Sequence, residues 1–145
     1  MCPVRRTKRD DLKKVHKIAD ISLKEDYTGE LFIAIKEVWE EGFLVYEMNG
    51  KVVGFICGTI LDEKSVRILM LAVHHLYRNQ GIGSELLQRF VEVSSSMGGK
   101  RIVLEVRVSS SKAIKFYQKR GFKVTEKIED FYTNGEDGYK MVRYL

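Results

Sequence analysis

The chain has 145 residues, enough for one hydrophobic core, and we expect a single domain over residues 1–145. Hydrophobic residues make up 44% and charged residues 31%, and no apolar run approaches the roughly 20 residues of a membrane span. Two cysteines are too few for a disulfide framework, and the charged start without a signal peptide predicts a cytoplasmic protein. The net charge of +5 leaves nucleic acid, an acidic substrate, a phosphorylated cofactor and plain solubility open.

The first half of the chain predicts a short strand and then two helices. A strand is expected near Val4, and Thr7 and Asp10 have the spacing of a capping box. The helix that follows has an apolar face made of Leu12, Val15, Ile18 and Ala19. The stretch GELFIAIKEVWEE predicts a second helix that ends at Gly42 in a left-handed conformation.

A three-stranded meander is expected next. FLVYEMNGKVVGFICGTIL predicts two strands joined at Asn49 and Gly50, whose tolerance of positive φ suits a type I′ turn. VRILMLAV, residues 66–73, predicts the third strand. His74 and His75 follow it, and on an extended chain their rings would point to opposite sides, so we expect no metal site there.

The remaining elements alternate helices with strands. The sequence predicts a helix from Ile82 to about Met97, a strand over 101–108, a short helix over 111–120 closed by Gly121, and strands over 122–128 and 137–145. The helix after the meander should connect two parallel neighbouring strands. The expected architecture is an α/β fold with a mixed central sheet in the order β-α-α-β-β-β-α-β-α-β-β.

The stretch RNQGIG, residues 78–83, joins the third meander strand to the long helix. The first amides of a helix lack internal partners and carry partial positive charge, so bare backbone at this point can bind a phosphate. An isolated pair of glycines fits a tight strand-to-helix turn equally well. A P-loop and a dinucleotide fingerprint are excluded, because Ser84 and Glu85 follow the second glycine and Leu86 replaces the third.

Three motifs together resemble the GNAT acyltransferases. RNQGIG fits the signature Q/R-x-x-G-x-G/A, and LEVRVSSSKAIKFYQKRGF is similar to the family's second conserved region. The ending FYTNGEDGYKM resembles the Y-Y-x-x-G-E-D-A-x-x-M of the branch that acetylates protein N-termini, which includes ribosomal-protein and archaeal enzymes. The motifs cover Val66 to the end of the chain, whereas the first half agrees in element order alone.

The resemblance implies an enzyme that moves an acetyl group from acetyl-coenzyme A to a primary amine, without a metal. A protein or peptide N-terminal α-amine is the favoured acceptor, with a small-molecule amine or a lysine as the alternative on the same fold. A non-catalytic acyl-coenzyme A binding module is the rival from another class. We expect no nucleic-acid or membrane partner, and the sequence specifies no oligomeric state.

The resemblance also assigns roles to two side chains. Glu105 matches the strand glutamate that accepts the amine's proton through a water, and Tyr117 matches the tyrosine that gives a proton to the departing thiolate. Each has a structural alternative: Glu105 could pair with Arg107 or another cation, and Tyr117 could pack in the core beside Ala113.

The resemblance implies one group of residues that bind the cofactor and another that binds the acceptor. Two departures from the family pattern affect them: Ser110 stands where the family usually has Asn, and the loop before the second helix lacks the usual proline and aromatic residues. Tyr27, Tyr132 and Tyr139 are expected to contact the acceptor. The predicted cofactor residues are Leu71, Val73, Arg78, Asn79, Gln80, Gly81, Ile82, Gly83, Ser84 and Ser110.

Overall fold

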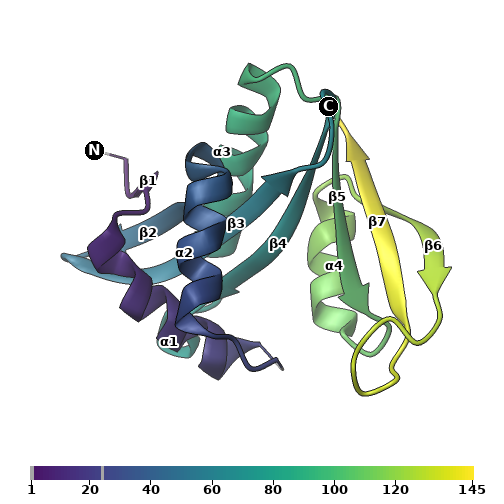
Figure 1. The fold of residues 1–145 in the computed structure, drawn as a ribbon, viewed down its shortest axis with the longest axis horizontal. Helices are drawn as coiled ribbons and strands as arrows, with labels where there is room; N and C mark the ends of the chain where they lie inside the picture. Colours follow the sequence, from purple (N-terminus) through teal and green to yellow (C-terminus); the bar gives the residue numbers. More distant parts are fainter. Residues whose placement is uncertain (1, 24) are drawn as a thin grey trace.

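A computed structural model describes residues 2–23 and 25–145. It contains a seven-stranded mixed sheet in the order β1-β2-β3-β4-β5-β7-β6, with helices on both faces (Figure 1). The helices are α1 (Leu12–Ser22), α2 (Gly29–Val38), α3 (Ile82–Ser96) and α4 (Ser111–Lys119). The strands are β1 (Val4–Arg6), β2 (Leu44–Met48), β3 (Lys51–Ile60), β4 (Ser65–Val73), β5 (Arg101–Arg107), β6 (Lys123–Ile128) and β7 (Gly138–Tyr144). The order of elements and the mixed sheet confirm the predicted fold.

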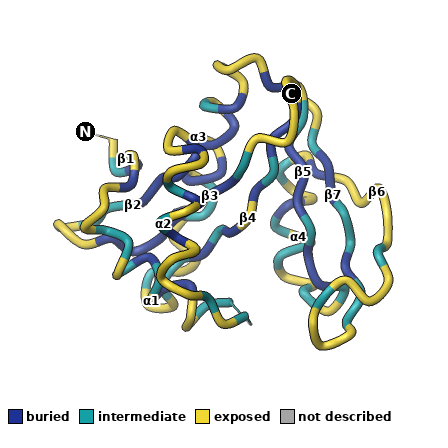
Figure 2. Tube along the Cα trace, viewed as in Figure 1, coloured by how far each residue is buried: buried dark blue, intermediate teal, exposed yellow. Residues whose placement is uncertain are grey.

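The sheet separates two hydrophobic cores. One core, which we call the α3-side core, packs α3 and Tyr117 of α4 against the strands, and Phe90 and Leu86 are fully buried in it. The α1-side core packs α1 and α2 against the other face, around Phe32 and Phe55. Burial of each such side chain contributes about 1.5–3 kcal/mol. Figure 2 shows that burial is concentrated in the central strands, whereas the edge strand β6 is almost wholly exposed.

The sheet opens between β4 and β5. These parallel strands pair only over Ser65–Arg67 and Arg101–Val103, and beyond that point they diverge (Figure 1). The prediction of parallel neighbours is therefore confirmed for the first part of each strand. Past Arg67, the edge of β4 that faces β5 pairs with no other strand among the described residues, so backbone groups on it can bind another molecule.

A β-bulge in β4 lies within this open part. Cys57 of β3 pairs with Met70, but the next residue of β3 pairs with Ile68, so Leu69 is the extra residue. The bulge changes which side chains face which core. After it, Leu71 and Val73 pack on the α3-side core, while Met70 belongs to the α1-side core.

The start of α1 differs from the prediction. Thr7 and Asp10 form no capping box: the hydroxyl of Thr7 is buried without a hydrogen-bond partner among the described residues. Instead the backbone N–H of Lys8 donates to Asp11 Oδ2 over 2.7 Å. Arg5 explains the change, because both of its Nη atoms donate to the Asp11 carboxylate. The carboxylate thus caps the 3-10 turn η1 (Arg9–Asp11) that precedes α1.

The end of α2 also differs. The helix ends at Val38, a short 3-10 turn, η2 (Glu40–Gly42), follows, and Gly42 does not adopt the left-handed conformation. A Cβ on Gly42 would lie 2.3 Å from the ring of Trp39, so close packing rather than backbone conformation requires glycine. The Asn49–Gly50 turn is confirmed, with φ angles of 51° and 77°.

The expected orientation of the two histidines is wrong. The 3-10 turn η3 (His75–Tyr77) begins directly after His74, so the chain is not extended there. The rings of His74 and His75 stack with their centroids 4.5 Å apart. His74 Nδ1 accepts a hydrogen bond from the backbone N–H of Leu76 over 3.2 Å, which makes it part of the turn.

No helix among the described residues is both long and apolar enough to cross a bilayer.

Candidate active site

The glycine loop delivers the exposed N-terminus of a long helix to the end of β4. Gly81 is the residue before α3 and has φ of 80°, a conformation that glycine adopts without strain. A Cβ built on Gly81 would have no atom within 4 Å, so its backbone faces open space. The 15-residue helix that follows directs its unpaired amides and the positive end of its dipole at this space. This geometry fits the binding of a phosphate.

A cleft of about 980 Å³ extends from this loop between β4 and α4. Almost every predicted cofactor residue lines it, together with Tyr117. Gln80 is the exception, since it does not line the cleft and its side chain is exposed. The cofactor residues on the wall of the cleft are Leu71, Val73, Arg78, Asn79, Gly81, Ile82, Gly83, Ser84 and Ser110.

The cleft reaches from one face of the sheet toward the other. Ser22 and Leu23, at the end of α1, also line it, although α1 and α4 cover opposite faces. The divergence of β4 and β5 makes this connection possible. Two molecules that enter from opposite faces can therefore meet between the strands.

The open edge of β4 presents backbone groups to the cleft. The N–H of His74 donates to Val53 O on β3, and main-chain groups alternate in direction along a strand, so those of Leu71 and Val73 point away from β3. Arg78 Nε donates to Val73 O over 3.1 Å. This leaves the N–H of Val73 and the main-chain groups of Leu71 available to an extended ligand.

Two predicted residues from the α4 side lie on the cleft wall. Ser110 precedes α4, and its hydroxyl makes no cap hydrogen bond, so it is free to contact a ligand. Tyr117 is buried, and its ring packs edge-on against Phe116 and Phe122. Burial raises the pKa of the Tyr117 phenol above its ordinary value, so the hydroxyl keeps its proton at neutral pH. It can therefore donate a hydrogen bond.

Glu105 faces the opposite side of β5 from Tyr117. Its neighbours Leu104 and Val106 belong to the α3-side core, and strand alternation directs Glu105 to the other face. Its cation partner is Arg67 of β4, whose Nε lies 3.3 Å from Glu105 Oε1 without an aligned hydrogen bond. The expected alternative, a partner cation, is therefore present, although it is not Arg107. The carboxylate spans the point where the two strands separate, and its side chain is 12% exposed.

Arg107 organises the loops beyond the end of β5. Its Nη1 donates to Asn134 Oδ1 and Glu136 Oε1, both over 3.2 Å, and its Nη2 donates to Glu25. The guanidinium also lies 4.1 Å from the centroid of the Tyr132 ring. One buried cation thus ties the α1–α2 loop to the β6–β7 loop. Sequence reasoning missed this group because its partners are far apart in the chain.

Of the three tyrosines predicted to contact the acceptor, Tyr132 lies against Arg107, and Tyr27 packs against Phe32. Burial raises the pKa of Tyr132 to about 12, and the charge of Arg107 opposes that shift. Burial also raises the pKa of Tyr27, and the positive charge of Arg107 again opposes the rise. Tyr139 does not join them, because it packs against the α3-side core.

A row of lysines on α4 was also missed. Lys112, Lys115 and Lys119 line the cleft. Their spacing of three and four residues places them on one side of the helix. That spacing is visible in the sequence and could have predicted an anionic ligand along α4.

The fold and the cleft fit an enzyme that binds an extended, phosphorylated ligand where its sheet opens between β4 and β5. The profile of the acetyltransferase (GNAT) family matches residues 9–122. An N-alpha-acetyltransferase of Sulfurisphaera tokodaii is 33% identical, and the alignment covers 98% of this chain and 92% of that protein. The chain therefore belongs to the GNAT family, and it is an N-acetyltransferase that uses acetyl-coenzyme A.

Solved structures agree with this assignment. Ard1 from Thermoplasma volcanium superimposes with a TM-score of 0.95 at 35% identity, covering 98% of this chain and 96% of that chain. Naa50 of Arabidopsis thaliana, in complex with the bisubstrate analogue CoA-Ac-MVNAL, gives a TM-score of 0.87 at 26% identity, covering 98% and 97%. The similarity extends over nearly the whole chain, including the first half, in which the sequence contains none of the family motifs quoted above.

Proposed function

We propose that this protein acetylates the N-terminal α-amine of a peptide or protein. The observation that carries the proposal is the cleft, which gathers the predicted cofactor residues except Gln80 and reaches through the sheet to the end of α1. Relatives that align over nearly the whole chain are N-alpha-acetyltransferases. In this proposal the peptide approaches from the face that carries Glu105, Arg107 and the α1–α2 loop.

The residues on the cleft wall fit acetyl-coenzyme A. The amides of the loop and of the first turn of α3 would hold the pyrophosphate, aided by the charge of Arg78. The open edge of β4 at Leu71 and Val73 would pair with the amide groups of the pantetheine arm. When bound, acetyl-coenzyme A supplies a thioester whose carbonyl carbon forms the new C–N bond while the C–S bond breaks.

The chain's own residues would handle the protons. A terminal α-amine has a pKa of about 8 and is largely protonated at neutral pH, so it must lose a proton before it attacks. Glu105 would accept that proton through a water, and its contact with Arg67 would hold the carboxylate in place. Tyr117 would donate a hydrogen bond to the sulfur as negative charge develops on it, because burial keeps its hydroxyl protonated.

A screen of short peptides tests the acceptor. Each peptide would carry one internal lysine and a different first residue, and mass spectrometry of fragments would locate the acetyl group. A matched set with blocked N-termini is the control. We expect acetylation at the free N-terminus alone, with rates that depend on the first residue. Acetylation of the lysine in the blocked set, or of small amines alone, would replace this proposal with the alternative acceptors.

Two broader predictions stay untested. We propose that residues 1–145 act as one GNAT unit, since the described residues form a continuous sheet with both cores built on it. Expression of the 145-residue chain alone should then yield an active enzyme.

The cytoplasmic location expected from the sequence stays a prediction, and cell fractionation would test it.

A further inference from the structure

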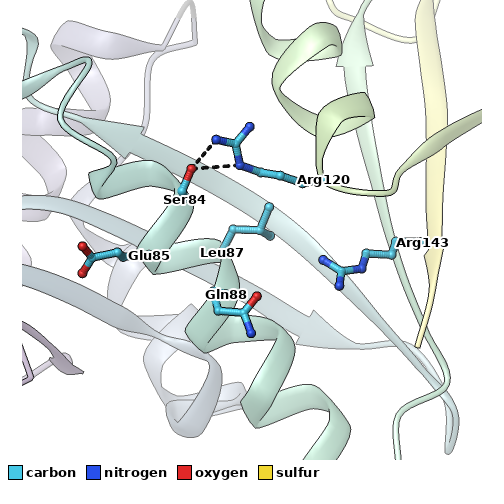
Figure 3. Close-up of a pocket in the computed structure, with 6 residues that line it drawn as sticks. All are labelled: Ser84, Glu85, Leu87, Gln88, Arg120 and Arg143. Atoms are coloured by element: carbon cyan, nitrogen blue, oxygen red, sulfur yellow. Dashed lines mark hydrogen bonds between the residues drawn. The ribbon is translucent and has the colours of Figure 1, made fainter.

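A second, smaller pocket of about 360 Å³ lies beside the main cleft (Figure 3). Ser84 and Arg120 line both spaces, so the two adjoin at the start of α3. The second pocket lies between α3, the end of α4 and β7, and the predicted site residues other than Ser84 are absent from its wall. It is lined by Ser84, Glu85, Leu87, Gln88, Arg120 and Arg143.

Arg120 is held in a fixed position at the junction. Its Nε donates to the hydroxyl of Ser84 over 2.9 Å, its Nη2 donates to the same oxygen, and its Nη1 donates to Phe116 O over 2.9 Å. The guanidinium carbon lies 3.8 Å from the centroid of the Phe116 ring. A guanidinium has five N–H donors, so these bonds leave one free on each Nη atom. The Ser84 hydroxyl accepts here and keeps its own hydrogen for a ligand.

Arg143 supplies a second cation from the opposite wall. It extends from β7 toward α3, and Figure 3 shows the two guanidinium groups on the same side of α3. Glu85 is the acidic residue of the pocket, but its carboxylate points away from both arginines. Among the described residues neither arginine forms an ion pair with a carboxylate, although most other arginines near the sheet do so. The pocket therefore has excess positive charge and free donors.

We propose that this pocket binds the ribose 3′-phosphate of acetyl-coenzyme A and so selects the 3′-phosphorylated carrier over its dephosphorylated form. The proposal rests on the placement of the pyrophosphate at the glycine loop given above. The 3′-phosphate is on the nucleotide end, on the other side of the pyrophosphate from the thioester. Tyr117 lines the main cleft but not the smaller pocket, which shares only Ser84 and Arg120 with that cleft. A phosphate monoester carries a charge of about −1.5 to −2 at pH 7, which two guanidinium groups match.

Calorimetry with coenzyme A and dephospho-coenzyme A tests the proposal without any variant. These ligands differ only in the 3′-phosphate. We expect coenzyme A to bind at least about tenfold more tightly, the equivalent of about 1.4 kcal/mol, and the ratio to shrink as ionic strength rises. Equal affinities would overturn the inference and leave the acetyltransferase proposal intact, whereas no binding of either ligand would contradict the cofactor placement itself.

Variants assign the preference to the pocket. Arg143→Gln should weaken coenzyme A severalfold and leave dephospho-coenzyme A unchanged, and Arg143→Lys should restore part of the difference. Arg89→Gln is the matched control, because Arg89 lies on the same helix as Ser84, is half exposed and lines neither pocket. If Arg143→Gln weakens both ligands by the same factor, or if Arg89→Gln has the same effect, the 3′-phosphate does not bind there.

Discussion

Tyr117 combines burial with a position on the wall of the cleft. Because its raised pKa keeps the phenol protonated, its contribution should come when negative charge develops on the leaving sulfur. Tyr117→Phe should therefore lower kcat by about 10²-fold while the affinity for acetyl-coenzyme A stays nearly constant. Steady-state kinetics and calorimetry on the same preparation would measure both. Equal turnover in the two proteins would make Tyr117 a core residue only.

Glu105 leads to a different prediction, since its proposed partner is the acceptor. Glu105→Gln should reduce kcat/KM by about 10²- to 10⁴-fold at neutral pH. The defect should shrink above the amine's pKa of about 8, where more of the acceptor arrives already deprotonated. The measurement is the pH profile of both proteins with one good peptide. A reduction by one constant factor across that range would indicate that Glu105 positions groups through Arg67 and accepts no proton.

Local signals at the level of elements predicted most of the fold. The positive φ of Gly81, Gly98 and Gly121 marks the helix ends that the sequence indicated, and the apolar face of α3 is buried as expected. The errors occurred where a distant side chain changed the local preference. Arg5 binds the carboxylate of Asp11, which caps the 3-10 turn before α1, and the Trp39 ring gives Gly42 a packing role that no local pattern encodes.

Asp11 therefore connects the first strand to the first helix, which predicts a pH-dependent stability. Burial alone would raise the pKa of Asp11, but the hydrogen bonds from Arg5 and the Lys8 N–H outweigh it and lower the pKa below 3.8. A carboxylate with a lowered folded-state pKa stabilises the fold above its unfolded pKa and loses that effect as pH falls through the folded pKa.

Asp11→Asn should accordingly cost about 1–2 kcal/mol at pH 7, the upper part of the range for a lost cap. The difference from the wild type should shrink as pH falls through the lowered folded-state pKa of Asp11. Urea unfolding of both proteins across pH 2–7 would measure it, with Asp10→Asn, the neighbouring exposed carboxylate, as the control. A difference that is independent of pH would mean that the amide disturbs packing and that charge has no role.

At the scale of the whole molecule, the site depends on contacts that no single segment contains. Motifs located the glycine loop, Tyr117 and Glu105 because each lies in a continuous stretch of sequence. They could not indicate that Arg107 joins Glu25 to Glu136, or that Arg143 at the end of the chain lies beside the start of α3. No sequence pattern predicts the bulge at Leu69 either, yet the bulge places Leu71 and Val73 on the cleft wall.

The two faces of the sheet should be separable by mutation. Gly83 lines the cofactor cleft, and a Cβ there would already be in van der Waals contact with the Phe116 ring, at 3.5 Å. The larger side chain of Gly83→Val would need room on this wall of the cleft and should abolish the binding of acetyl-coenzyme A. Arg107→Gln acts on the other face. It leaves Glu25 and Glu136 without their shared cation, so the two loops around the acceptor lose their connection.

Arg107→Gln should raise the KM for a peptide by about tenfold or more while the affinity for acetyl-coenzyme A stays within about twofold, because loop order contributes to acceptor binding alone. Arg101→Gln is the matched control: Arg101 begins the same strand and pairs with Asp62 and Ser65 at the closed end of the sheet, far along β5 from Arg107. Kinetics with varied peptide and calorimetry with the cofactor would separate the two effects. If Arg107→Gln weakens cofactor and peptide alike, the loops and the cleft form one cooperative unit, and the assignment of the two substrates to opposite faces is wrong.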